Sequence, residues 1–274
     1  SGHCERETGT GAWSGRGGLR AARRYGPVCA VEPGLYFDCQ YNRPTLGMDG
    51  DGVRKLTWPE ATILRPKRRA RGTQIWQLMG VEPSRAWQSF AQELIDVALR
   101  EDITGLVALG SMLADVPHTR PITIHAGSEN EALRDAMGLE RSAYEGPVGI
   151  LSVLGAAAEE AGIPTASLWA SVPHYVAGHS PSPKATLALL DRLEDLTGAQ
   201  LPRADLAEQS TKWEATIDAA AADDDEMTEY IRQLERTRDM VDSPEAFGDA
   251  IAKALESYLR RDGDGPAQPG RDAL

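Results

Sequence analysis

The chain has 274 residues, of which 41% are hydrophobic and 26% charged, and its formal net charge is −12 at pH 7. This is the composition of an ordinary globular protein, and no apolar stretch approaches the ~20 residues that span a bilayer, so we expect no membrane. Acidic residues dominate 191–262, which argues against nucleic acid as a partner because phosphates would be repelled. The first residues lack the apolar segment of a secretory signal, so we expect a cytoplasmic protein.

The beginning of the chain predicts little regular structure. Residues 1–30 are rich in glycine and arginine and show no apolar period of two or 3.6 residues. We therefore expect a poorly ordered or atypical N-terminal segment. The pattern then changes, and short apolar runs predict strands over residues 35–40, 61–64 and 73–79.

Helical and strand patterns alternate in the next part of the chain. A helix is predicted to open at Ser84, because apolar residues recur at helical spacing after it. Further runs predict strands over 105–110, 122–125 and 165–171, with a helix over 149–161. Strand–helix–strand order is typical of parallel sheets covered by helices on both faces. Residues 31–182 are therefore expected to form an α/β core with a mostly parallel sheet.

The C-terminal part is predicted to be helical. Amphipathic stripes run from 183 to 261, beginning with Pro183 at a first helical position. We expect this helical region to pack on the α/β core. Residues 262–274 are rich in Gly, Pro and Asp, so a disordered tail is expected there.

One tripeptide follows two of the predicted strands. Val116–His118 comes after the run at 105–110, and Val172–His174 comes after the run at 165–171. In a parallel sheet, the loops that leave the strand ends collect ligand contacts, so we expect both loops at one edge. The candidate ligand-binding residues of these loops are His118, Thr119, Arg120, His174 and Tyr175.

The chemistry of these candidates leaves alternatives open. Each histidine can act as a general base, a phosphate donor or a metal ligand, or can simply bond a nearby carbonyl. No acidic residue or cysteine stands at a spacing that completes a triad or a metal site, so we expect no metal. Arg120 can hold a phosphate or carboxylate with two bonds, unless Asp115 pairs with it and makes it inert.

Glu82 is a further candidate, in the connection Gly80–Ser84 between a predicted strand and a helix. It can serve as a general base, and the helix N-terminus after it can bind an anion. The alternative is an ordinary helix start at which Ser84 supplies the cap. No nucleotide-binding loop is visible, so no cofactor is expected.

An ordered series of motifs resembles one known family. In chain order the motifs are Asn42–Thr45, Gly80–Pro83 with Trp87, Ala114–Pro121, Tyr144–Pro147, Val172–Val176 and Ser182–Ala185. From about Val31 to Arg261 the chain is similar to the proteasome assembly chaperone 2 family, and more narrowly to its actinobacterial members. Residues 1–29 depart from the family's usual opening, an apolar strand followed by an acidic turn and a helix.

The resemblance implies a three-layer α/β/α sandwich with a mostly parallel sheet, similar to the phosphorylase/hydrolase-like fold. It also implies self-assembly into a homo-oligomer, a trimer or larger. Eukaryotic relatives assist proteasome assembly, and the family provides no catalytic residue set to carry over to this chain.

Two functions therefore stay open. A non-enzymatic, assembly-chaperone-like or protein-interaction role is favoured by the resemblance and by the incomplete catalytic set; its partners would be the chain itself and another protein. A small-molecule hydrolase or phosphorylase using the two Val-Pro-His loops is the alternative, favoured by fold analogy. A pocket bridging His118 and His174 would favour the enzyme, whereas a large exposed apolar patch would favour the interaction protein.

Overall fold

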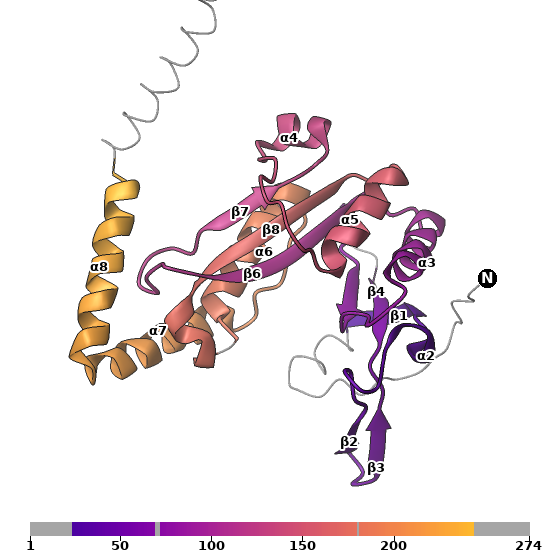
Figure 1. Cartoon of the computed structure of the whole chain (residues 1–274), viewed down its shortest axis with the longest axis horizontal. Helices are drawn as coiled ribbons and strands as arrows, with labels where there is room; N and C mark the ends of the chain where they lie inside the picture. Colours follow the sequence, from indigo (N-terminus) through magenta and orange to yellow (C-terminus); the bar gives the residue numbers. More distant parts are fainter. Residues whose placement is uncertain (1–23, 69–71, 180, 244–274) are drawn as a thin grey trace, which may run out of the picture. The chain divides into compact units, whose positions relative to one another are not determined.

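The computed structural model describes residues 24–68, 72–179 and 181–243 (Figure 1). The chain divides into two compact units. Among the described residues, unit 1 consists of those in 24–111, 124–170 and 186–204, and unit 2 of those in 112–123, 171–185 and 205–243. No helix in the described part of the chain is both long and apolar enough to cross a membrane.

Unit 1 begins with a small antiparallel sheet of strand order β1-β4-β5. Its strands are β1 (Tyr25–Ala30), β4 (Ala61–Pro66) and β5 (Gln77–Gly80). β4 lies in the middle of the sheet and buries Ala61, Thr62 and Leu64. The strand predicted at 61–64 is confirmed, but β1 was not expected, because a glycine-and-arginine-rich composition gave no period to read. The rest of the N-terminal segment that was predicted to be poorly ordered or atypical, residues 1–23, lies outside the described residues.

The strand predicted over 35–40 is wrong. A one-turn helix, α2 (Pro33–Tyr36), occupies the start of this stretch. Pro33 suits the first helical turn, and the Glu32 carboxylate accepts a hydrogen bond from the Gly34 N–H. A β-hairpin then follows, with β2 (Thr45–Met48) and β3 (Arg54–Thr57) forming a two-stranded sheet of their own (Figure 1).

A third sheet has the strand order β6-β8-β7. Its strands are β6 (Leu106–Ala114), β8 (Thr165–Pro173) and β7 (Ile124–Gly127), and β7 runs antiparallel to β8. β8 lies between its two neighbours and is the most buried strand of the three. A Cβ added at Gly110 of β6 would lie 2.4 Å from the indole of Trp169 on β8, so only glycine fits beneath that ring.

Two helices of unit 1 pack against each other, α3 (Trp87–Arg100) and α5 (Ile150–Glu160). Their apolar faces share a core in which Phe90, Leu94 and Leu154 lie among the buried residues. A second cluster joins Ile95 of α3 to Ala158 of α5. The short helix α4 (Glu131–Met137), capped by the Asn130 side chain, was not predicted.

The predicted C-terminal helices are present up to the end of the described residues. They are α6 (Pro183–Thr197), α7 (Leu206–Ala222) and α8 (Asp225–Val241). In unit 2, α7 packs on the segment after β8 through Val176, Trp213 and Ile217. The helix predicted after Ser243 and the tail 262–274 lie outside the described residues.

The expected three-layer α/β/α sandwich with a mostly parallel sheet is wrong. The pairs β1–β4, β4–β5, β2–β3 and β7–β8 are antiparallel, and the strands are divided among three small sheets. The fold is mixed α/β. The prediction failed because an apolar run reveals a strand but not its direction, and strand–helix–strand order was taken to mean parallel crossovers throughout.

Candidate functional site

The two Val-Pro-His segments meet in unit 2. Val172 and Pro173 are the last residues of β8, and His174 begins a 3₁₀ helix, η1 (His174–His179). The backbone N–H of His118 donates to the Tyr175 hydroxyl over 2.8 Å, and His118 Nδ1 lies 2.9 Å from the same oxygen. The first segment is thereby fixed to the residue that follows the second.

His118 lies at the centre of this cluster, with 1% of its surface exposed. Its Nε2 lies 3.0 Å from the carboxylate of Asp218 on α7, and its ring is edge-on to Trp213. Both ring nitrogens of His118 therefore lie within hydrogen-bond distance of a polar partner, Nδ1 of the Tyr175 hydroxyl and Nε2 of the Asp218 carboxylate. Burial raises the pKa of Tyr175 to about 12, so this hydroxyl keeps its proton at neutral pH.

Arg120 and Thr119 are bound by carboxylates of α8. Arg120 Nε and Nη2 lie 2.7 and 2.8 Å from the two oxygens of Asp239, and Nη1 lies 3.3 Å from Glu235. The Thr119 hydroxyl donates to the same Glu235 carboxylate over 2.5 Å. The hydrogen bond from Arg120 lowers the pKa of Asp239. The sequence suggested that Arg120 could hold an external anion with two hydrogen bonds. In the structure, Arg120 makes these two bonds to Asp239 of α8 instead.

His174 has a different environment. Its Nδ1 lies 3.2 Å from Asp115, the acid that sequence reasoning offered as a partner for Arg120. Its ring stands edge-on to Tyr175 and to Tyr230 of α8, with centroids 5.6 and 5.7 Å apart. Because 43% of the His174 side chain is exposed, this pair lies at the rim of the cluster.

The carboxylates that complete this cluster were missed by sequence reasoning. Asp218, Glu235 and Asp239 lie in the acidic C-terminal half, whose charge served only as an argument against a nucleic-acid partner. The signal available was the i, i+4 spacing of Glu235 and Asp239, which places both acids on one face of a helix. Lys184 was quoted only as part of a motif, yet its ammonium donates to the His118 carbonyl over 2.6 Å and pairs with Glu214.

Glu82 belongs to unit 1 and not to this cluster. Its carboxylate accepts a hydrogen bond of 2.8 Å from the N–H of Ile150, the first residue of α5. α5 begins after Gly149, which has no side chain to supply a cap, so Glu82 caps this helix from a distant part of the chain. Ser84 does not cap α3; its hydroxyl instead accepts from the Asp38 N–H over 3.1 Å.

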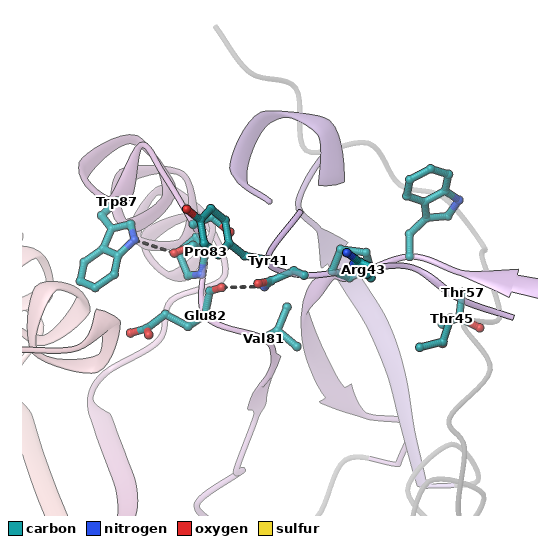
Figure 2. A pocket seen from close by; sticks show the side chains of 12 residues that line it. Tyr41, Arg43, Thr45, Thr57, Val81, Glu82, Pro83 and Trp87 are labelled. Atoms are coloured by element: carbon teal, nitrogen blue, oxygen red, sulfur yellow. Dashed lines mark hydrogen bonds between the residues drawn. The ribbon is translucent and has the colours of Figure 1, made fainter. Parts of the chain in front are cut away.

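A hollow of about 850 Å³ lies beside Glu82 in unit 1 (Figure 2). The residues leading into β2, those leaving β3 and those before α3 surround it, namely Tyr41, Asn42, Arg43, Thr45, Thr57, Trp58, Pro59, Val81, Glu82, Pro83, Ser84 and Trp87. The Asn42 amide donates to the Glu82 carbonyl over 3.1 Å, and the Trp87 indole to the Pro83 carbonyl over 2.6 Å (Figure 2). These two bonds hold the early motifs of the chain together.

The wall of this hollow presents large apolar groups to solvent. Tyr41 is 81% exposed, Trp58 50% and Val81 46%, whereas Pro83, which also lines the hollow, is fully buried. Tyrosine and tryptophan are residue types enriched in protein interfaces, where they supply much contact area at low entropic cost. Five of the six motifs thus gather at two places, a polar cluster within unit 2 and an aromatic hollow within unit 1, and Tyr144–Pro147 belongs to neither.

Comparison with known families decides the relationship. The sequence profile of the PAC2 family matches residues 24–221. The chain belongs to the PAC2 family. The resemblance inferred from the motifs is thereby confirmed, and similar solved structures come from the actinobacterial genera Streptomyces and Mycobacterium. A comparison with curated proteins finds no match.

Solved structures of PAC2 proteins share this fold. A PAC2 family protein from Streptomyces avermitilis is 41% identical, with 74% of this chain and 86% of that chain covered and a TM-score of 0.68. A proteasome-assembly chaperone homologue from Mycobacterium tuberculosis is 39% identical, with 77% and 90% covered and a TM-score of 0.68. An archaeal proteasome activator from Pyrococcus furiosus, at 12% identity, 74% and 85% coverage and a TM-score of 0.55, shares the fold alone.

Proposed function

We propose that this PAC2 family chain is a non-enzymatic, assembly-chaperone-like protein that binds a proteasome component. The observation that carries the proposal is the 39% identity to the proteasome-assembly chaperone homologue of Mycobacterium tuberculosis, over 77% of this chain. The polar groups that sequence reasoning assigned to ligand binding support it, because Arg120 is engaged by Asp239 and His118 by Asp218.

The aromatic hollow of unit 1 is the surface that we assign to the partner. Tyr41 and Trp58 flank it with large exposed faces, and the bond from Asn42 to the Glu82 carbonyl holds the segment that carries Tyr41. Exposed aromatic groups on a fixed backbone are typical anchors of a protein interface. The occupant is then a segment of a proteasome subunit that inserts an apolar side chain between them.

Self-association is the second part of the proposal. The family resemblance favours a homo-oligomer, with three or more copies as the expected number. Exposed apolar side chains of the β2–β3 hairpin support it, since Leu46, Met48 and Leu56 are 57%, 71% and 45% exposed. Mass photometry of the full chain over a dilution series measures the number of copies directly.

The partner proposal is tested by binding to purified cognate proteasome subunits. We expect the parent chain to bind a subunit, and Tyr41→Ser and Trp58→Ser each to weaken binding about tenfold or more, as loss of an interface anchor does. Leu99→Ser is the matched control, because Leu99 on α3 is 49% exposed and does not line the hollow.

Two outcomes would contradict the proposal in different ways. A parent chain that binds no proteasome subunit at tens of micromolar would contradict the function. Binding that Tyr41→Ser and Trp58→Ser leave unchanged would contradict the assigned surface while keeping the partner.

A further inference from the structure

Strand β2 has one edge that no strand covers. The Asp49 N–H donates to the Val53 carbonyl over 2.9 Å, so Asp49–Val53 is a hydrogen-bonded pair of the hairpin. Hydrogen-bonded pairs alternate with non-hydrogen-bonded pairs along an antiparallel ladder, so the next hydrogen-bonded pair is Gly47–Lys55. The backbone N–H and C=O groups of Leu46 and Met48 therefore point away from β3, toward the open edge. Within the described residues no other strand pairs with this edge, and an open edge is a template for a further strand.

One face of the hairpin is apolar and exposed. Leu46 lies opposite Leu56, and Met48 lies on the same face two residues further along β2. These three side chains are largely exposed to solvent. A two-stranded hairpin is marginally stable alone in water, so extending it by further strands and covering this face would stabilise it.

The edge is complementary to itself about Gly47. Suppose that β2 pairs antiparallel with β2 of a second copy and that Gly47 lies on the two-fold axis. Leu46 of each copy then lies opposite Met48 of the other, and the outward backbone groups of these residues form hydrogen bonds between the two strands. A Cβ added at Gly47 would meet nothing within 4 Å in its own chain, so no contact inside the chain requires glycine there. Glycine within a strand often marks the close approach of another backbone.

Charge favours the same register. Arg43 and Asp51 each lie four residues from Gly47, on opposite sides, so the axis brings Arg43 of one copy beside the acidic turn Asp49–Asp51 of the other. Among the residues that the structure describes, Arg43 has no ion-pair partner. The two-fold axis makes this contact twice, which favours a second copy over an unrelated strand as the occupant.

We propose that β2 is a self-association edge at which two copies form one four-stranded antiparallel sheet, in the order β3-β2-β2-β3, with Gly47 on the axis. This contact rests on the proposed self-association of the chain and identifies the strand through which two copies bind. Because the contact has two-fold symmetry, it joins copies in pairs, as a dimer or as pairs within a larger assembly.

A cysteine at the axis tests the contact. Opposite residues of an antiparallel sheet have Cα atoms about 4.5–5.5 Å apart, within the range that a disulfide bridges. In a Cys39→Ser background, which removes an exposed free cysteine, Gly47→Cys should form a covalent dimer on mild oxidation. Lys55→Cys is the matched control, since Lys55 is the partner of Gly47 on β3 and its two copies would be about 14 Å apart, three strand spacings.

The charge contact is tested by exchange. Arg43→Asp and Asp51→Arg should each weaken dimerisation roughly two- to thirtyfold, because each breaks two exposed ion pairs. The double variant should recover most of the loss. Asp51 is the residue to change because the Asp49 carboxylate accepts from the N–H groups of Asp51 and Val53 and holds the turn.

Each outcome separates this proposal from the one that it rests on. A disulfide at 47 but not at 55, together with recovery in the charge exchange, supports the contact. Oligomers in mass photometry without a disulfide at 47, or with one at 55 instead, overturn the β2 contact and leave self-association standing. A monomer at every concentration overturns both.

Discussion

Arg120 is held by two carboxylates that stand more than one hundred positions away in sequence. Asp239 takes two of its nitrogens and Glu235 a third. The same helix face therefore binds the first Val-Pro-His segment through Thr119 and Arg120 at once. At the scale of single residues, the segment acts as a docking point for α8.

The attachment of α8 should depend on pH. The hydrogen bond from Arg120 lowers the pKa of Asp239 in the folded chain. The pair therefore contributes fully above the ordinary aspartate pKa of about 3.9 and loses its contribution as pH falls through the lower folded value. We expect Arg120→Ala to lower the melting temperature at pH 7, and the difference from the parent to shrink as the pH falls below about 3.9.

Arg236→Ala is the control for this prediction. Arg236 also pairs with a carboxylate, that of Glu229 on its own helix, but 69% of its side chain is exposed. Such a pair contributes little to stability, so this variant should melt close to the parent at every pH. An Arg120→Ala effect that is the same at pH 3 and at pH 7 would contradict the assigned role of Asp239.

Gly110 carries a second prediction at this scale. Its Cβ would lie 2.4 Å from the Trp169 ring, so Gly110→Ala must displace the indole or the strand. We expect a loss of about 1–3 kcal/mol in the free energy of unfolding, the usual cost of overpacking. Gly155→Ala in α5 makes the same change where no atom lies within 4 Å, and should stabilise by about 0.5–1 kcal/mol. Urea unfolding measures both; equal effects would contradict the contact.

Sequence reasoning found His118, Arg120 and Tyr175 because a repeated tripeptide marked them. It did not find their partners, since Asp218 and Asp239 lie on helices whose acidic surface looks the same whether it faces water or a buried histidine. The geometry also assigns Glu82 a different role. The sequence left two roles open for it, a general base or a residue of an ordinary helix start. Its carboxylate bonds the N–H of Ile150, a contact 68 positions away.

At the scale of elements, strand direction was the main error. Apolar runs located β4, β6 and β8, since buried strands need such residues whichever way they run. Direction depends on the connection, and β7 follows β6 through a loop and pairs antiparallel with β8. The β2–β3 hairpin was missed because its strands are four residues long and exposed, so no buried face imposed a pattern.

The cap of α5 gives a prediction at the scale of elements. Glu82→Ala removes the acceptor for the Ile150 N–H and should lower the free energy of unfolding by about 0.5–2 kcal/mol, as loss of a helix cap does. Glu82→Gln keeps a side-chain oxygen there and should lose less than half of that amount. Urea unfolding of the two variants checks this, and identical losses would show that the charge, rather than the hydrogen bond, matters.

At the scale of the whole molecule, family membership was predicted correctly although the sheet was not. The ordered motifs identified the PAC2 family by resemblance, and several of them make tertiary contacts, such as the bond from Asn42 to the Glu82 carbonyl and that from Lys184 to the His118 carbonyl. The net charge of −12 also has a structural use, since carboxylates of α7 and α8 bind Lys184 and Arg120.

A time course of proteasome assembly tests the central claim most directly. Purified cognate α and β subunits are mixed with and without the full chain, and the fraction of assembled particles is followed by mass photometry. We expect the chain to accelerate assembly, and Tyr41→Ser to remove the acceleration while Leu99→Ser keeps it. Assembly that proceeds at the same rate with the chain, its Tyr41→Ser variant or no addition would contradict an assembly-chaperone role.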